Sequence, residues 1–158
     1  MINEAYCSYE LSKLLHENGF HQETFARYAA ERITESWYDE YRERVLKFDW
    51  DEGYFLSPED MRHDIYGETI PAPTHQMAMG YLWEDYKIFI APFVAIDLNG
   101  KYHYGFRLIG SDCKDIVDHK ELVNIGFRDS YDEIVDVALV YSLKNIVSKI
   151  TKKTLDTH

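Results

Sequence analysis

The chain has few cysteines and no long apolar run, and each shortage excludes a class of protein. Its two cysteines, Cys7 and Cys113, form no CxxC pair, so neither a disulfide framework nor a cysteine-rich zinc site is available. No apolar run approaches the roughly 18 residues of a membrane span, and the N-terminus lacks the basic and apolar regions of a signal peptide. We therefore expect no membrane association and a location in the reducing cytoplasm.

The sequence also lacks the common catalytic motifs. It contains no G-x-S-x-G, no H-E-x-x-H, no Walker-type loop and no glycine-rich phosphate cradle. The absence of these motifs disfavours an enzymatic function but does not exclude one. We expect no cofactor.

Basic residues are outnumbered by acidic ones, 17 to 28, which gives a formal net charge of −11. A protein that neutralises phosphates usually carries the opposite balance, so direct binding of nucleic acid is disfavoured. A negative charge keeps a protein soluble, and it is also compatible with a surface that docks on a basic partner. The 13 tyrosines supply apolar area with a polar tip, which suits half-buried positions and interfaces.

The clearest structural pattern covers residues 71–109. Thr74 is a good N-cap for a helix over about 75–87, and two prolines before it keep that helix from starting earlier. Asn99-Gly100 lies between two apolar runs, which is the strongest short-range signal for a β-hairpin. The sequence therefore predicts a helix that leads into a hairpin over 88–109.

A two-residue turn at Asn99-Gly100 also determines the expected pairing. It sets Val94 opposite Gly105 and Phe93 opposite Phe106. Because side chains alternate, one face should be buried against helices. That face consists of Phe89, Ala91, Phe93, Ala95, Tyr102, Tyr104, Phe106 and Leu108. Pro92 cannot donate to a ladder, so we expect this strand to lie at an edge or to bulge there.

The remaining segments predict further helices and one strand. We expect a helix from Asn3 to about Asn18 that ends at Gly19 with Phe20 folded back on it, and helices over about 22–37 and 37–47. Segment 49–73 is the expected place for a long excursion or a mobile lid. A strand over 121–127 follows the hairpin.

Ser130-Tyr-Asp-Glu133 forms a capping box directly before an apolar helical run, which predicts a last helix to about Lys149 and a frayed tail over 151–158. Together these elements predict an α+β fold in which residues 1–150 form a single domain. Its small antiparallel sheet consists of the central hairpin 88–109 plus the strand near 121–127, with helices packed on one face.

Three stretches of the chain resemble a known family. They are Glu4–Leu15 with Gly19-Phe20 behind it, Pro73–Glu84 and Ser130–Ile146, and they span almost the whole chain. The chain resembles a family of short uncharacterised proteins encoded by gut Bacteroides-type bacteria and their phages or mobile elements. In that family the central stretch more often has Lys where Gly80 stands. The resemblance implies a small cytoplasmic accessory protein, and it carries over no activity and no catalytic residues.

A second likeness concerns the C-terminal half. A strand or two followed by a helix with a Ser-Tyr-Asp-Glu cap is similar to the antitoxin domain of the HicB type. The order helix–strand–strand–strand–helix from Thr74 to Lys149 also looks like a double-stranded-RNA-binding domain. That family needs a basic start to its last helix, whereas this helix starts Asp129-Ser-Tyr-Asp-Glu. The likeness to that family therefore stops at topology.

The densest polar cluster lies between Ser111 and Glu121. Asp112, Asp115 and His119 offer oxygen and imidazole ligands for a metal. Cys113 is a candidate catalytic nucleophile if His119 or His103 folds near it. Their spacing matches no calcium or zinc motif, so a solvated loop is the simpler interpretation.

Two other places are candidate sites. His63, with acidic residues nearby, offers a metal or general-base site in the long segment 49–73. The polar face of the hairpin, with Lys101, His103 and Arg107, is the candidate binding surface.

From these observations we favour a non-enzymatic accessory or interaction protein of phage or mobile-element origin that binds a host or phage protein. The acidic, tyrosine-rich composition and the missing catalytic motifs support it. A small metal-dependent hydrolase that uses the 112–121 loop is one alternative, and a HicB-like antitoxin or transcriptional regulator is another. The edge strand that contains Pro92 also leaves a homodimer open.

Overall fold

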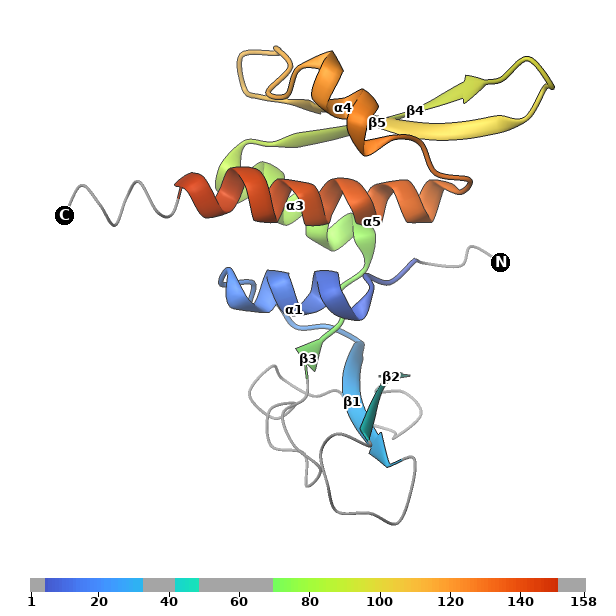
Figure 1. The fold of residues 1–158 in the computed structure, drawn as a ribbon. Helices are drawn as coiled ribbons and strands as arrows, with labels where there is room; N and C mark the ends of the chain where they lie inside the picture. The colour runs from blue at the N-terminus through green and yellow to red at the C-terminus, as the bar shows by residue number, and fades with distance from the viewer. Residues whose placement is uncertain (1–4, 33–41, 49–69, 151–158) are drawn as a thin grey trace. The chain divides into compact units, whose positions relative to one another are not determined.

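The computed structural model describes residues 5–32, 42–48 and 70–150. They belong to two compact units, one containing Tyr6 to Thr74 and the other containing Ala5 and the chain from His75 onward. Figure 1 shows the helices and strands in chain order. The fold is α+β with small antiparallel sheets, as the sequence predicts.

In the first unit, helix α1 (Tyr9–Glu17) begins and ends on local signals. Its N-cap is Ser8, whose side chain accepts a hydrogen bond from the Leu11 amide, so the expected start at Asn3 is wrong. Its end is as predicted. Gly19 has φ +96°, and the Phe20 amide donates to the Leu15 carbonyl at 2.9 Å, which completes a Schellman motif.

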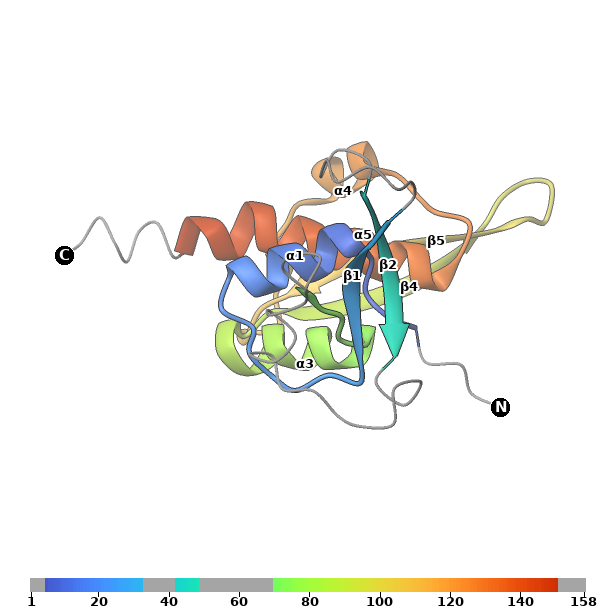
Figure 2. The same ribbon diagram turned by 90° about the horizontal axis from the view of Figure 1, so that it is seen from below.

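The helices predicted over 22–37 and 37–47 are wrong, because two strands occupy the described parts of these segments. β1 (Ala26–Arg32) pairs antiparallel with β2 (Arg42–Phe48), and the two strands run side by side in Figure 2. On its other edge β1 pairs with the short β3 (Ile70–Pro71), so the strand order is β2-β1-β3. The local sequence of β1 suits a helix, but pairing with β2 along its whole length and with β3 at Arg27 and Tyr28 overrides that preference.

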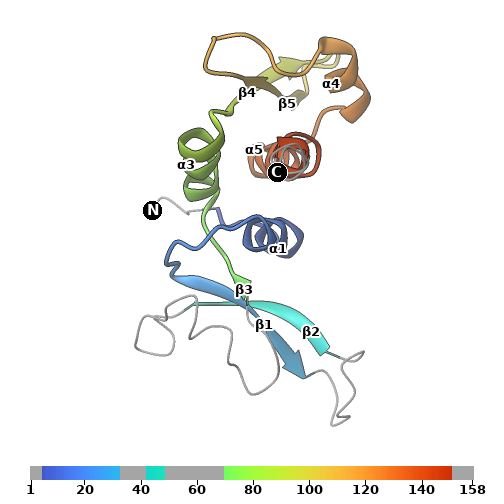
Figure 3. The ribbon, with the colours of Figure 1, turned by 90° about the vertical axis from the view of Figure 1, so that its left-hand side faces the viewer.

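The second unit places a hairpin on two helices. It contains α3 (His75–Tyr86), β4 (Phe89–Ile96), β5 (Tyr102–Ile109) and α5 (Tyr131–Ser142), which continues as a π-helical turn, η3 (Leu143–Val147). The hairpin packs on α5, and α3 packs against both α5 and β4 (Figure 3). Ser130 caps α5 by accepting from the Glu133 amide at 3.2 Å, as the capping box predicts.

The core of this unit is apolar and comes from all four elements. The buried apolar residues of these elements are Ala78, Tyr81, Leu82, Ile90, Phe106, Leu108, Ile134, Val135, Ala138, Leu139, Leu143 and Val147. The apolar helical run predicted after the capping box is therefore confirmed as the buried face of α5.

The pairing within the hairpin differs from the prediction by one residue. Phe93 lies opposite Gly105 and Pro92 lies opposite Phe106. The loop has three residues instead of two, because the Gly100 amide donates to the Asp97 carbonyl and the Asp97 amide to the Lys101 carbonyl, both at 3.0 Å. Gly100, with φ +79°, takes the left-handed conformation that ends such a loop.

This one-residue shift moves every side chain of β4 to the opposite face of the hairpin from the one predicted. Ile90 is buried, whereas Phe89 and Phe93 are exposed, so the predicted core face is wrong for β4 and right for Phe106 and Leu108 of β5. We call the face that carries Phe93 and Gly105 the outer face of the hairpin, and the face that packs on α5 the inner face.

The strand expected over 121–127 is also wrong, because a short helix, α4 (His119–Ile125), lies there. Asp118 caps α4, since its carboxylate accepts from the Glu121 amide at 2.9 Å. Gly126, with φ +80°, ends it. The pattern Asp118-x-x-Glu121 is a helix start of the same kind as the one recognised at residue 130.

Several predictions fall on residues outside the described ranges. They are the excursion or lid expected over 49–73, of which only 70–73 is described, the site at His63 and the tail over 151–158. The single domain over 1–150 stays a prediction. Within the described residues, no helix has both the length and the apolar character needed to cross a bilayer.

Candidate functional site

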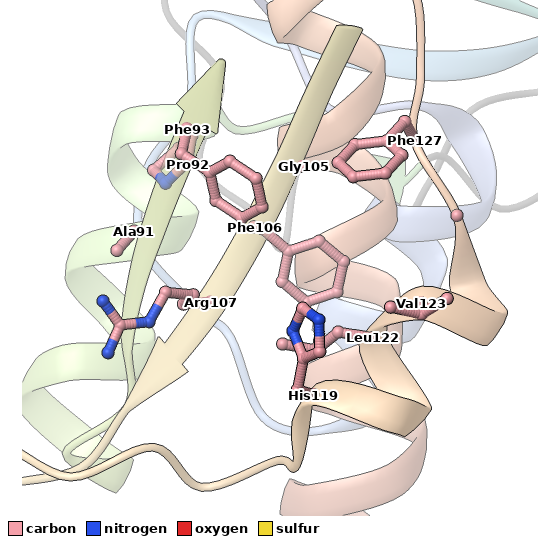
Figure 4. Close-up of a pocket in the computed structure, with 11 residues that line it drawn as sticks. Ala91, Pro92, Phe93, Gly105, Phe106, Arg107, His119, Leu122, Val123 and Phe127 are labelled. Carbon is pink, nitrogen blue, oxygen red and sulfur yellow. The ribbon is translucent and has the colours of Figure 1, made fainter. Parts of the chain in front are cut away.

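A pocket of about 460 Å³ opens on the outer face of the hairpin. Strands β4 and β5 form one side of it, and α4 with the residue pair after it forms the other (Figure 4). The pocket is lined by Ala91, Pro92, Phe93, Gly105, Phe106, Arg107, His119, Leu122, Val123, Gly126 and Phe127. Its volume lies in the range of ligand-binding clefts, and its lining is mostly apolar.

Gly105 determines the shape of the pocket. A Cβ at this position would lie 2.6 Å from the Phe93 ring and 2.9 Å from the Phe127 ring, closer than carbon atoms can approach. Without a side chain at Gly105, both rings lie over β5 and meet edge to face, with centroids 6.1 Å apart. The two rings stay exposed to solvent, as does Val123 of α4.

Helix α4 is joined to α5 by a hydrogen bond. The Tyr141 hydroxyl donates to the Glu121 carboxylate. Burial, followed by this hydrogen bond, raises the pKa of Tyr141 to about 12. The phenol is therefore a neutral donor at physiological pH, and it ties one wall of the pocket to the core helix.

The charge at the rim of the pocket is balanced within the molecule. Arg107 Nε and Nη2 donate to the two carboxylate oxygens of Asp115 at 2.9 and 3.0 Å. This bidentate pair lowers the pKa of Asp115 and raises the pKa of Arg107, the hydrogen bond being the largest cause of both shifts. The Arg107 guanidinium also points away from the ring of His119 in Figure 4. The pocket therefore presents little net charge.

His119 lines the pocket from α4, together with Leu122 and Val123 (Figure 4). It makes no hydrogen bond or ion pair with any described residue. An imidazole in this position can donate or accept one hydrogen bond to a bound group.

The other predicted binding residues lie at the tip of the hairpin and are engaged in ion pairs. His103 Nε2 lies 2.9 Å from Asp97 Oδ2, and His103 Nδ1 lies 3.6 Å from Asp129 Oδ1. Lys101 Nζ lies 3.5 Å from the same Asp129 oxygen. Lys101, His103 and Arg107 therefore do not form one site, because Lys101 and His103 share Asp129 at the tip of the hairpin, whereas Arg107 is paired with Asp115.

The candidate metal and nucleophile residues of the 112–121 loop are spread apart by the fold. Asp112 accepts from the Lys114 amide, Asp115 is held by Arg107, and His119 faces the pocket. Cys113 is exposed, at φ +64° in a tight turn. Among residues 5–32, 42–48 and 70–150, no three histidine, cysteine or carboxylate side chains come together in a way that could hold a metal ion.

Sequence reasoning missed the aromatic part of the site. It assigned Phe93 to the core, and it gave no role to Phe127 or Val123. A signal for the correct turn was present in Asp97-Leu-Asn-Gly100, because an aspartate three residues before a glycine favours a type I turn with a glycine bulge. That turn exposes Phe93.

Comparisons of the chain with models of protein families, with curated proteins and with solved structures yield no match.

Proposed function

We propose that this chain is a non-enzymatic interaction protein that binds another protein through the outer-face pocket of its hairpin. The observation that carries the proposal is the exposed aromatic pair Phe93–Phe127, which lies at a concave, apolar surface beside Val123. Apolar clefts with aromatic rings at their rim are typical of the centres of protein interfaces.

The occupant that suits the pocket is an uncharged, apolar side chain of the partner. The rim cation Arg107 is already neutralised by Asp115, so an acidic group would gain little there. Burial of an apolar partner side chain against the rings and aliphatic side chains of the lining is favourable, and His119 supplies one hydrogen bond.

The resemblance to proteins of gut Bacteroides-type bacteria and their phages leads us to expect the partner among host or phage proteins in the cytoplasm. The hydrolase alternative has no support from the described residues, because the carboxylates of the 112–121 loop are held in intramolecular contacts. No described feature favours the HicB-like regulator either. We therefore propose the interaction protein alone.

The test uses tagged full-length protein as bait in lysate of the natural host, read by mass spectrometry. Val123→Lys places a charge in the pocket at an exposed position, so it should abolish binding while the chain stays folded. Leu98→Lys is the matched control, because it makes the same change from apolar to charged at the fully exposed loop of the hairpin. We expect a stoichiometric partner that Leu98→Lys retains and Val123→Lys loses. Equal recovery by both variants, or no partner at all, would contradict the proposal.

A further inference from the structure

The two edges of the β4–β5 hairpin differ in how their backbone groups are satisfied. On β5, the Tyr104 amide donates to the Arg128 carbonyl at 2.8 Å, and the Arg128 amide donates back at 2.9 Å. Both backbone groups of Tyr104 therefore point away from β4. In an antiparallel pair such outward-pointing residues lie opposite each other and recur at every second position. Val94, which pairs with Tyr104, must point its own amide and carbonyl away from β5.

The same alternation applies along β4 to Pro92 and Ile96, which also point outward. This explains why the hairpin tolerates Pro92, since the amide that proline lacks would not have bonded to β5. Unlike Pro92, Val94 and Ile96 have backbone amides, and these point away from β5. We call this side of β4, which faces away from β5, the free edge. No described residue donates a backbone hydrogen bond to them or accepts one from them on this edge.

The free edge has almost none of the usual protection against pairing. Strand β4, Phe-Ile-Ala-Pro-Phe-Val-Ala-Ile, contains no charged residue, whereas exposed edges normally carry lysines, bulges or covering segments. Toward the tip the hairpin extends past the first turn of α5 (Figures 1 and 2). There the Val94 and Ile96 side chains of the inner face are 52% and 63% exposed. An uncharged edge with apolar side chains beside it is a template for another strand.

We propose that the free edge of β4 pairs with β4 of a second copy of this chain, antiparallel and about a two-fold axis at Ala95. In this register Val94 of each copy faces Ile96 of the other. Two such pairs form four backbone hydrogen bonds, and none of them requires the amide that Pro92 lacks. The two hairpins become one four-stranded sheet.

A second copy suits this edge because the two-fold pairing brings no charged side chains of β4 together. The chain carries a net charge of −11, which opposes association wherever acidic surfaces meet. Strand β4 has no charged residue, so two copies of β4 do not repel each other. The nearest carboxylate, Asp97, is turned into the hairpin loop, where it accepts from the Asn99 and Lys101 amides at 2.8 and 2.9 Å. A two-fold axis brings identical patches together, so Val94 and Ile96 of both copies bury one another.

This inference can be tested apart from the proposed function, because Val94 and Ile96 do not line the pocket and α4, which carries Val123, lies on the β5 side of the hairpin (Figure 3). A variant of the free edge and a variant of the pocket therefore report on different surfaces. Val94→Lys tests the edge, with Ile96→Lys as a second variant. Val123→Lys, a matched change at an exposed valine of α4, serves as the control.

The experiment measures the molar mass of the full-length protein by light scattering over a range of concentrations. We expect the wild type and Val123→Lys at twice the chain mass of 18.7 kDa, and both edge variants at the chain mass. Amide hydrogen exchange adds a direct readout. The Val94 and Ile96 amides should exchange at least about tenfold more slowly in the wild type than the Ile96 amide does in Val94→Lys.

Three results would overturn the proposal. The first is a wild type that is monomeric at every concentration. The second is a dimer in which the Val94 and Ile96 amides exchange freely, because another surface would then hold it together. The third is protection of these amides in a monomer, which would mean that a segment of the same chain covers the edge.

Discussion

Gly105 is the residue on which the pocket depends. We expect Gly105→Ala to destabilise the protein by about 1–3 kcal/mol, because the added methyl group overlaps the Phe93 and Phe127 rings and must displace them. Urea unfolding measures the change. Gly80→Ala is the matched control: nothing lies within 4 Å of a Cβ there, and alanine favours the helix by about 1 kcal/mol. Two substitutions with the same sign would contradict the packing described for Gly105.

Asp97 makes the hairpin turn sensitive to pH. The hydrogen bond to His103, followed by that from the Lys101 amide, lowers the pKa of this carboxyl below its ordinary value of 3.8. A lowered pKa in the folded state means that the charged carboxylate stabilises the turn above pH 3.8, and that this contribution is lost as the pH falls through the folded-state pKa.

We therefore expect the Asn99 and Lys101 amides to lose protection from hydrogen exchange only below the ordinary carboxyl range. An NMR titration of the Asp97 carboxyl checks the direction of the shift. Asp97→Asn, which keeps the shape without the charge, should remove the pH dependence. A carboxyl that titrates at its ordinary value would show that the turn does not depend on it.

Among the elements, β4 offers the clearest test of the register. Ile90 is 2% exposed and its neighbour Phe89 is 51% exposed. We expect Ile90→Ala to cost about 2–5 kcal/mol of unfolding free energy, and Phe89→Ala to cost about 1 kcal/mol or less. Chemical denaturation of both variants gives the comparison. With the two-residue turn expected from Asn99-Gly100, Phe89 would be buried instead, and Phe89→Ala would then cost more unfolding free energy than Ile90→Ala.

Helix α4 depends on its N-cap residue, Asp118. Asp118→Ala removes the side chain that accepts from the Glu121 amide, so we expect a loss of about 1 kcal/mol. Because α4 forms one wall of the pocket, the same substitution should weaken partner binding without abolishing it. Asp118→Ser, which keeps a capping oxygen, is the control. If alanine and serine behave alike, the cap does not hold the helix.

At the scale of the whole molecule, the prediction of a single domain can be tested through the two units. Tyr28 donates to the Cys7 carbonyl at 2.7 Å in the first unit, and Leu139 is fully buried in the second. If one domain contains both, Tyr28→Phe and Leu139→Ala should shift the same cooperative transition, by about 1 and 2–5 kcal/mol. Urea curves followed by circular dichroism and by tryptophan fluorescence should coincide. Two separate transitions would show that the units fold independently.

Local signals in the sequence determined where several elements begin and end. The Gly19-Phe20 ending of α1, the Ser130 cap of α5 and the existence of the hairpin were all predictable. Each depends on residues within a few positions of one another, whose backbone conformations and hydrogen bonds are set by local chemistry. The apolar bands of α3 and α5 were predictable for the same reason, because helical spacing brings nearby residues to one face.

Only the tertiary structure decided which segments became strands and which face of β4 was buried. β1 is a strand because it pairs with β2 across segment 33–41 and with β3 across a much longer stretch of chain, and no local pattern records that pairing. The register of the hairpin depended on whether the loop contains two residues, Asn99 and Gly100, or three, from Leu98 to Gly100. This difference of one residue exchanges the core and solvent faces of β4. The pocket follows from that exchange, since Phe93 lines it only when it points away from α5.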